Sequence, residues 1–204
     1  MIGEVPARRL AVVVLAAGAG SRFDGGGKLV ASLEGRAILQ HVLDAVAEAP
    51  LREVIVVTRP DAEPLEQSIA WRAERRVPNP RPEDGLASSL KVGLAALDVE
   101  VEGALVVLGD QPRVRSIVIR RVADAWRNGA GPIVAARYSR DGAPNPVLLD
   151  RSVWPLAFGL SGDRGMGPVL REKPGLVRWI DVAGENPDVD TRADLEELAG
   201  EGSA

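Results

Sequence analysis

Cysteine is absent from this sequence of 204 residues, and histidine occurs once, at His41. The lack of cysteine excludes disulfide bonds and thiolate metal sites, and by itself leaves the cellular compartment open. His41 lies beside apolar residues at helical spacing, and a single histidine in that setting is typical of a packed or surface position. No apolar run approaches the roughly 20 residues that span a bilayer, so we expect no membrane partner.

An excess of basic residues is also missing. Lysine and arginine number 25 against 29 acidic residues, which gives a formal net charge of −4. This balance argues against a general nucleic-acid binder, so anionic ligands must be held by local positive charges. Length and composition are ordinary for one α/β domain over residues 1–204, with a core from about 10 to 198.

The N-terminal region imitates a secretory signal, because Arg8 and Arg9 precede an apolar run. Removal of that run would delete a segment with the composition of a buried parallel strand. We therefore expect the run to be part of the fold and the protein to be cytoplasmic.

The stretch from Leu10 to Lys28, LAVVVLAAGAGSRFDGGGK, combines an apolar run with glycines and two cations. It predicts a buried strand that leads into a phosphate-binding loop. Gly18 and Gly20 allow positive φ and a close approach of ligand to backbone, while Arg22 and Lys28 supply full positive charges. The structural alternative is a glycine-rich turn whose charges are incidental.

Two better-known nucleotide loops do not match this stretch. A dinucleotide fingerprint needs a third glycine where Phe23 stands. A P-loop needs a glycine where Arg22 stands and a serine or threonine where Leu29 stands.

Apolar strand patterns alternate with helical patterns along the chain. This alternation implies parallel pairing with right-handed crossovers, and hence a three-layer αβα, Rossmann-like, mostly parallel sheet. Strands are predicted from residue 10 and over 53–58, 73–77, 103–108, 132–138 and 176–182. Helices are predicted over 38–46, 61–71, 117–128 and 152–160, within 83–94, and after Thr191. Three prolines predict an irregular loop at 78–82.

Polar residues follow several of these elements. Gly85, Ser88 and Ser89 open a helix whose N–H groups and hydroxyls suit a nucleotide, although a capped helix start explains the same residues. Asp110 follows the strand 103–108 at the edge where ligands of α/β sheets bind, and a carboxylate there suits Mg²⁺ beside a triphosphate. The alternative for Asp110 is a cap for the helix that follows it.

Five segments resemble, in order, the motifs of the MobA-like nucleotidyltransferases, which have the nucleotide-diphospho-sugar transferase fold. They are LAAGAGSR at 15–22 with Lys28, GLASSL at 85–90, GDQP at 109–112, GDRG at 162–165 and DVDT at 188–191. Within the last segment, Thr191 with Asp194 is explained by helix capping, which leaves Asp190 as the functional candidate.

The resemblance implies a site for a nucleoside triphosphate and Mg²⁺. Arg22 and the loop amides would hold the β- and γ-phosphates, Lys28 would stabilise the α-phosphate, and Asp110 with Asp190 would hold the metal. The nucleotide-binding residues implied are Leu15, Ala16, Ala17, Gly18, Gly20, Ser21, Arg22, Lys28, Gly85, Ser88 and Ser89.

The resemblance also implies an acceptor site formed by Asn145, Gly162, Asp163 and Gly165. Two departures occur there: Asn145-Pro146 stands where relatives often have His-Pro, and Gly167 stands where they often have arginine.

The sequence LAAG at 15–18 is similar to the molybdenum cofactor cytidylyltransferases, whereas guanylyltransferases of this branch more often have Leu-Ala-Gly-Gly. The activity implied is transfer of CMP from CTP to molybdopterin, for use by a molybdenum hydroxylase. Two alternatives stay open: a sugar- or polyol-phosphate nucleotidylyltransferase, and a non-catalytic cofactor-binding maturation protein. Some relatives are labelled oxidoreductases, but this sequence has no dinucleotide or flavin motif that supports hydride transfer.

Overall fold

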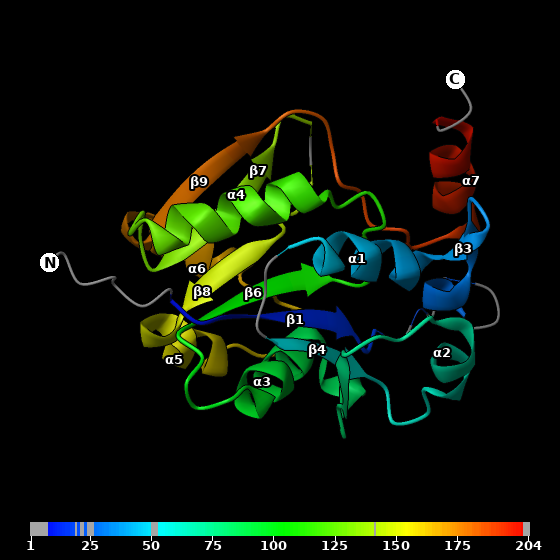
Figure 1. Cartoon of the computed structure of the whole chain (residues 1–204), viewed down its shortest axis with the longest axis horizontal. Helices are drawn as coiled ribbons and strands as arrows, with labels where there is room; N and C mark the ends of the chain where they lie inside the picture. Colours follow the sequence, from blue (N-terminus) through cyan, green and yellow to red (C-terminus); the bar gives the residue numbers. More distant parts are fainter. Residues whose placement is uncertain are drawn as a thin grey trace, which may run out of the picture.

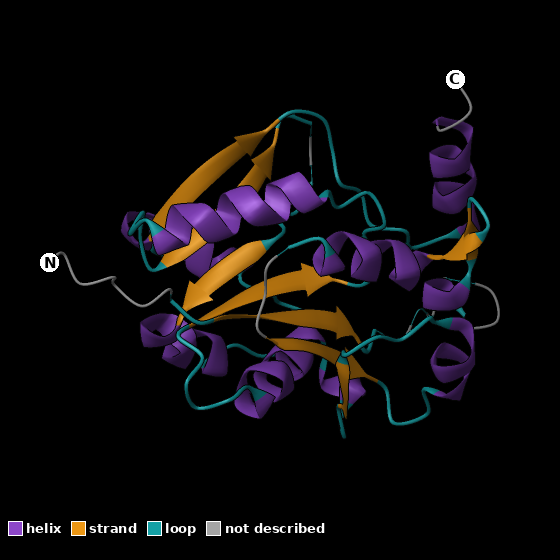
Figure 2. Ribbon diagram, in the orientation of Figure 1, coloured by secondary structure: helices purple, strands orange, loops and turns teal. Residues whose placement is uncertain are grey.

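The computed structural model describes residues 8–18, 20, 23, 27–49, 53–140 and 142–201 (Figures 1 and 2). The strands are β1 (Leu10–Ala16), β2 (Ser32–Leu33), β3 (Arg36–Ala37), β4 (Glu53–Thr58), β5 (Arg75–Pro78), β6 (Gly103–Leu108), β7 (Ile133–Tyr138), β8 (Val147–Asp150) and β9 (Val177–Val182). The α-helices are α1 (Ile38–Ala47), α2 (Glu63–Ser68), α3 (Leu86–Ala96), α4 (Ser116–Arg127), α5 (Trp154–Phe158), α6 (Gly167–Glu172) and α7 (Arg192–Glu201).

Within the described residues, seven strands form one mostly parallel sheet in the order β5-β4-β1-β6-β8-β7-β9. β1 pairs in parallel with both β4 and β6, and every residue of β1 is buried. Burial on both faces explains why its sequence, LAVVVLA, is apolar without alternation. β8 runs antiparallel to both of its neighbours, β6 and β7.

Helices cover both faces of this sheet, which gives three layers (Figure 1). One buried cluster joins alternate β1 residues such as Val12 and Val14 to α1 and α4. The other joins Val13 and Leu15 to α3, α5 and α6. The period-two alternation of a strand thus sends successive side chains into opposite cores. The predicted three-layer α/β architecture is confirmed.

Several predicted elements differ from the structure. The helix predicted over 61–71 is shorter, because Ile69 is extended with φ −105° and ψ 132°. Pro78 ends β5 instead of lying in an irregular loop, and an edge strand tolerates proline. The alternation of strands and helices missed β8, which follows β7 without a helix between them and therefore pairs antiparallel.

The C-terminal helix α7 lies beside the short hairpin of β2 and β3, away from the two sheet faces (Figure 1). Leu198 packs there with Leu33, Ile38 and Val189. This packing anchors the segment just before α7, which carries the DVDT motif, at the edge of the sheet. Among the described residues, no helix has the length and apolar character needed to span a membrane.

Candidate active site

The glycine loop after β1 opens at the carboxyl edge of the sheet, as predicted. Gly20 has φ +57°, whereas Gly18 does not adopt positive φ and has open space where a Cβ would stand. Ala16, Gly18 and Gly20 border a hollow of about 300 Å³ between the loop and α2, and Lys28 lines the same hollow. Leu15 lines a different cavity, and Ala17 is buried. Ser21 and Arg22 lie outside the described residues.

Lys28 lies between two of the predicted carboxylates. Its Nζ donates to Asp110 Oδ2 at 2.7 Å and to Asp190 Oδ1 at 3.0 Å. The chain supplies the three groups from a 3₁₀ turn (Lys28–Val30), from the end of β6 and from the segment before α7. The structure therefore brings together residues separated by up to 162 positions.

The electrostatics keep the Lys28 ammonium charged. Burial acts to lower the pKa of Lys28, but the carboxylates of Asp110 and Asp190 raise it above its ordinary value of 10.5. A lysine whose pKa is raised does not serve as a base near neutral pH. Its available chemistry is to donate hydrogen bonds and to neutralise negative charge.

Asp188 is a third carboxylate in this cluster and was not among the predicted site residues. Burial and the neighbouring charge of Asp110 raise the pKa of Asp188. The backbone N–H of Val189 donates to the carbonyl of Asp110 at 2.9 Å, which ties this segment to the end of β6. The DVDT motif contained the signal, since its two aspartates lie two residues apart in an extended segment.

The carboxylates fit a hard divalent cation. Across the described ranges, no group of three or more His, Cys, Asp or Glu side chains is arranged to hold a metal. Mg²⁺ needs fewer protein ligands, since it binds through one or two carboxylates together with substrate phosphates and water. The oxygens of Asp110 and Asp190 meet that requirement, and both now bind the Lys28 ammonium.

A buried amide cluster lies next to these carboxylates. Gln111 Oε1 accepts a hydrogen bond from Asn186 Nδ2 at 2.8 Å and a short one from Asn145 Nδ2. All three side chains are at most 3% exposed. They join the end of β6 to the segments before β8 and before Asp188, so the Gln111 carbonyl fixes the positions of the carboxylate-bearing segments.

Replacing Gln111 with methionine is expected to lower the free energy of unfolding by about 1–3 kcal/mol for each amide donor left without an acceptor. Methionine keeps the approximate volume but removes the oxygen that binds Asn145 and Asn186. Urea unfolding measures the change, and Gln67→Met on the exposed face of α2 is the matched control. Equal unfolding midpoints for the two variants would contradict the role assigned to this cluster.

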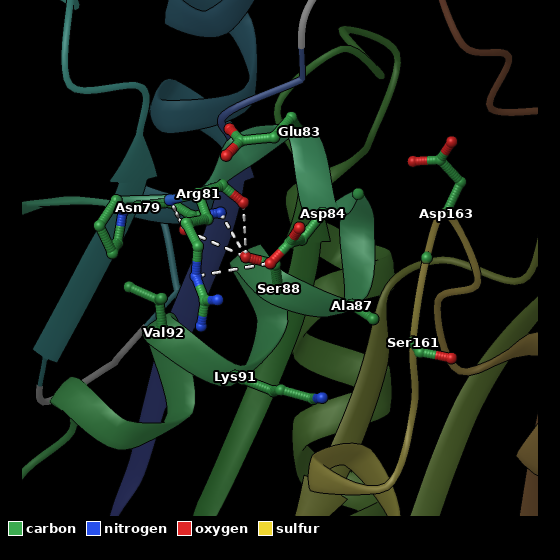
Figure 3. Close-up of a pocket in the computed structure, with 13 residues that line it drawn as sticks. Asn79, Arg81, Glu83, Asp84, Ala87, Ser88, Lys91, Val92, Ser161 and Asp163 are labelled. Carbon is green, nitrogen blue, oxygen red and sulfur yellow. Dashed lines mark hydrogen bonds and ion pairs between the residues drawn. The ribbon is translucent and has the colours of Figure 1, made fainter.

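The other predicted nucleotide-binding residues lie at the start of α3, where Gly85 and Ser88 line a hollow of about 530 Å³ and Ser89 is buried (Figure 3). Asn79 Nδ2 donates to Ser88 Oγ at 2.9 Å and to Ser89 Oγ at 3.1 Å, and Ser88 Oγ donates to the Arg81 carbonyl at 2.9 Å. In Figure 3, Ser88 faces Asn79 and Arg81. The two hydroxyls thus hold the loop after β5.

Gly85 is the N-cap residue of α3 and the helix has no side-chain cap, so capping does not explain Ser88 and Ser89. Gly85 has φ +84°, and a Cβ there would lie 2.5 Å from the carbonyl carbon of Gly162. The Ala87 N–H donates to the Gly162 carbonyl at 3.0 Å. Gly85 therefore allows the GDRG turn to pack against the helix start.

The predicted acceptor residues border a cavity of about 610 Å³. Asn145, Asp163 and Gly165 line it, together with Asp188, whereas Gly162 lines the hollow of Figure 3 instead. The floor is apolar and includes Leu15, Leu86, Leu90, Val106, Leu108, Met166 and Leu170. The cavity thus runs from the carboxylate cluster over an apolar surface.

Several alternative interpretations are now decided. Thr191 Oγ1 accepts from the Asp194 N–H at 3.2 Å, and Asp194 Oδ2 accepts from the Thr191 N–H at 2.8 Å, which confirms the capping pair. Asp110 does not cap the next helix, since α4 begins after Arg115 without a side-chain cap. His41 Nε2 lies 2.8 Å from the Leu33 carbonyl, which supports its structural interpretation.

Residues 12–177 match the MobA-like NTP transferase domain, and the chain belongs to this family. It is 32% identical over 188 residues to nicotine blue oxidoreductase of Paenarthrobacter nicotinovorans, covering 88% of this chain and 91% of that protein. It is 32% identical over 157 residues to the bifunctional protein GlmU of Leifsonia xyli subsp. xyli. That match covers 72% of this chain and 32% of GlmU, so the chain spans about a third of that relative.

Solved structures share the fold of this chain. Rv0371c from Mycobacterium tuberculosis H37Rv has a TM-score of 0.84 at 30% identity, with 95% of this chain and 98% of that chain covered. Its complex with manganese has a TM-score of 0.80 at 28% identity, with 94% and 98% covered. The fold and the family make this protein a MobA-like nucleotidyltransferase.

Proposed function

We propose that the protein transfers CMP from CTP to molybdopterin in a reaction that depends on Mg²⁺. The observation that carries the nucleotidyl-transfer part is the position of Lys28, a charged ammonium held by Asp110 and Asp190 at the edge where the glycine loop opens. The LAAG sequence at 15–18, which is similar to that of cytidylyltransferases, supports CTP as the donor.

The chemistry requires two anions to meet. A phosphate oxygen of the acceptor attacks the α-phosphorus, a new P–O–P linkage forms, and pyrophosphate leaves with the electron pair of the broken P–O bond. Lys28 would leave the carboxylates and donate to the α-phosphate, where negative charge must be stabilised during transfer. Bound Mg²⁺ would supply further charge neutralisation on the phosphates, with Asp110 and Asp190 as its protein ligands.

The acceptor would occupy the 610 Å³ cavity, whose volume is in the range of small-molecule sites. Asp188 places one end of this cavity beside the carboxylate cluster. A ligand lying on the apolar floor could therefore direct a phosphate to the nucleotide. This arrangement supports molybdopterin, in which a fused ring system carries a phosphate, and the product would pass to a molybdenum hydroxylase.

Nucleotide binding gives the first test. At about 100 times its dissociation constant, CTP with Mg²⁺ should add about 2.7 kcal/mol to the free energy of unfolding and raise the midpoint by about 5–10 °C. GTP, ATP and UTP should each raise it less, and Asp110→Ala should weaken the CTP effect. Equal shifts with all four nucleotides would contradict CTP selectivity.

One competing outcome is the sugar-phosphate alternative left open by the sequence, and the other follows from the name of the nicotine blue oxidoreductase relative. Pyrophosphate release with a sugar phosphate, and none with molybdopterin, would favour a sugar-phosphate nucleotidylyltransferase. A midpoint shift with NADH or NADPH, and none with a nucleoside triphosphate, would favour an oxidoreductase.

A further inference from the structure

Arg171 borders the acceptor cavity at the C-terminal part of α6. Its side chain is exposed, lines the cavity of about 610 Å³, and makes no ion pair or side-chain hydrogen bond within the described part of the chain. Arg164, on the turn before α6, has the same properties. Exposed arginines are common on surfaces, but these two line a cavity whose floor is apolar.

Gly167 leaves the space in which the Arg171 guanidinium lies. The two residues are four positions apart on α6, and helical side chains lean toward the N-terminus of their helix. Arg171 therefore extends back over Gly167, and its Nη1 would lie 3.4 Å from a Cβ at that position. A longer side chain at 167 would compete with the guanidinium for this space.

The charges around the cavity are arranged unevenly. Asp188 marks the end next to Lys28 and Asp110, while Arg164 and Arg171 belong to the GDRG turn and to α6. Asp163 also borders the cavity, with its Oδ1 close to Gly85. A ligand that reacts beside Lys28 would cross the apolar floor and carry its other end toward the two arginines.

We propose that Arg171, together with Arg164, binds a second anionic group of the acceptor and thereby determines acceptor specificity. Gly167 admits Arg171 to this position. The proposal rests on the proposed function for the reacting end and adds the substrate class: a molecule whose ring body carries a second anionic group besides the reacting phosphate. Guanidinium groups suit such an anion because they donate several hydrogen bonds in a fixed plane.

The test uses two probes of matched shape, naphthalene-1-sulfonate and uncharged 1-naphthalenemethanol, titrated by fluorescence. The wild-type protein should bind the sulfonate more tightly than the alcohol. Arg171→Ala should reduce this preference by about ten-fold, as expected for loss of a charge-assisted hydrogen bond. Gly167→Leu should reduce it similarly, because leucine displaces the guanidinium.

Two further variants make the result specific. Gly167→Arg combined with Arg171→Ala should recover most of the preference, since the arginine returns one turn earlier on the same helix face. Arg178→Ala, in edge strand β9 and outside the cavity, should leave the preference unchanged. Unfolding midpoints measured in urea establish that each variant is folded.

Three outcomes would overturn the proposal. The wild-type protein could bind the sulfonate and the alcohol equally, or Arg171→Ala and Arg178→Ala could have the same effect on the preference for the sulfonate. The third is that this preference is lost in Lys28→Ala and kept in Arg171→Ala. The probes need neither CTP nor molybdopterin. The two proposals can therefore fail separately. If the wild-type protein does not transfer CMP, but Arg171→Ala still reduces the preference for the sulfonate, the proposed function is contradicted and the proposed anion site is supported.

Discussion

Replacing Lys28 with alanine is expected to lower kcat/KM for nucleotidyl transfer by about 10²- to 10³-fold, or about 2.7–4 kcal/mol of transition-state stabilisation. The reason is that Lys28 carries a full charge beside the glycine loop and has a raised pKa. Its contribution should therefore not be lost through deprotonation near neutral pH. Steady-state release of pyrophosphate measures the effect, with Lys173→Ala on the exposed end of α6 as the matched control.

Metal binding separates the role of Lys28 from that of its partners. Because the Lys28 ammonium occupies Asp110 Oδ2 and Asp190 Oδ1, its removal should leave Mn²⁺ affinity unchanged or increase it. Electron paramagnetic resonance of free Mn²⁺ provides the measurement. A Lys28→Ala protein that loses metal affinity and activity together would indicate structural collapse of the cluster.

Replacing Asp110 with asparagine is expected to reduce metal-dependent turnover by about 10³-fold or more, since a bound metal supplies several kcal/mol of charge stabilisation. The shape of the side chain is kept, while the charge that attracts both Mg²⁺ and Lys28 is removed. Mn²⁺ affinity should fall with the turnover, in contrast to Lys28→Ala. Asp124→Asn removes an exposed surface ion pair with Arg127 and should leave both quantities unchanged.

The same titration decides which second carboxylate binds the metal. Asp190 shares the Lys28 ammonium with Asp110, whereas Asp188 lines the acceptor cavity. Asp190→Asn should therefore weaken Mn²⁺ binding more than Asp188→Asn does. The reverse order would assign the second ligand to Asp188 and would contradict the pairing predicted from the sequence.

The fold can be predicted from local sequence patterns, because the central strands are apolar along their whole length, as strands buried on both faces are. LAVVVLA in β1 and GALVVL in β6 are apolar throughout, and each occupies the interior of the sheet. The same logic placed Asp110 at the carboxyl edge, since a residue that follows a parallel strand must lie there. The sequence does not predict the antiparallel β8, because three apolar residues followed by an aspartate do not reveal the direction of a strand.

The finer structure of the site could not be predicted from one sequence. Gln111 accepts a hydrogen bond from Asn186, which lies 75 positions away, and no periodicity or motif in the sequence predicts this contact. Ser88 and Ser89 fit a nucleotide-binding helix start, but both hydroxyls accept hydrogen bonds from Asn79, which the sequence assigns to an irregular loop. The contact between Gly167 and the Arg171 guanidinium likewise depends on the conformation of the arginine side chain, which the sequence does not reveal.

The measurement that tests the central claim most directly is incubation of the protein with Mg²⁺, molybdopterin and CTP labelled at the α-phosphate. Our account predicts transfer of the label to molybdopterin with an equal amount of pyrophosphate released, more slowly with GTP, ATP or UTP, and greatly slowed by Lys28→Ala and Asp110→Asn. Absence of label transfer from every nucleoside triphosphate to molybdopterin and to sugar phosphates alike, with a folded protein, would contradict it.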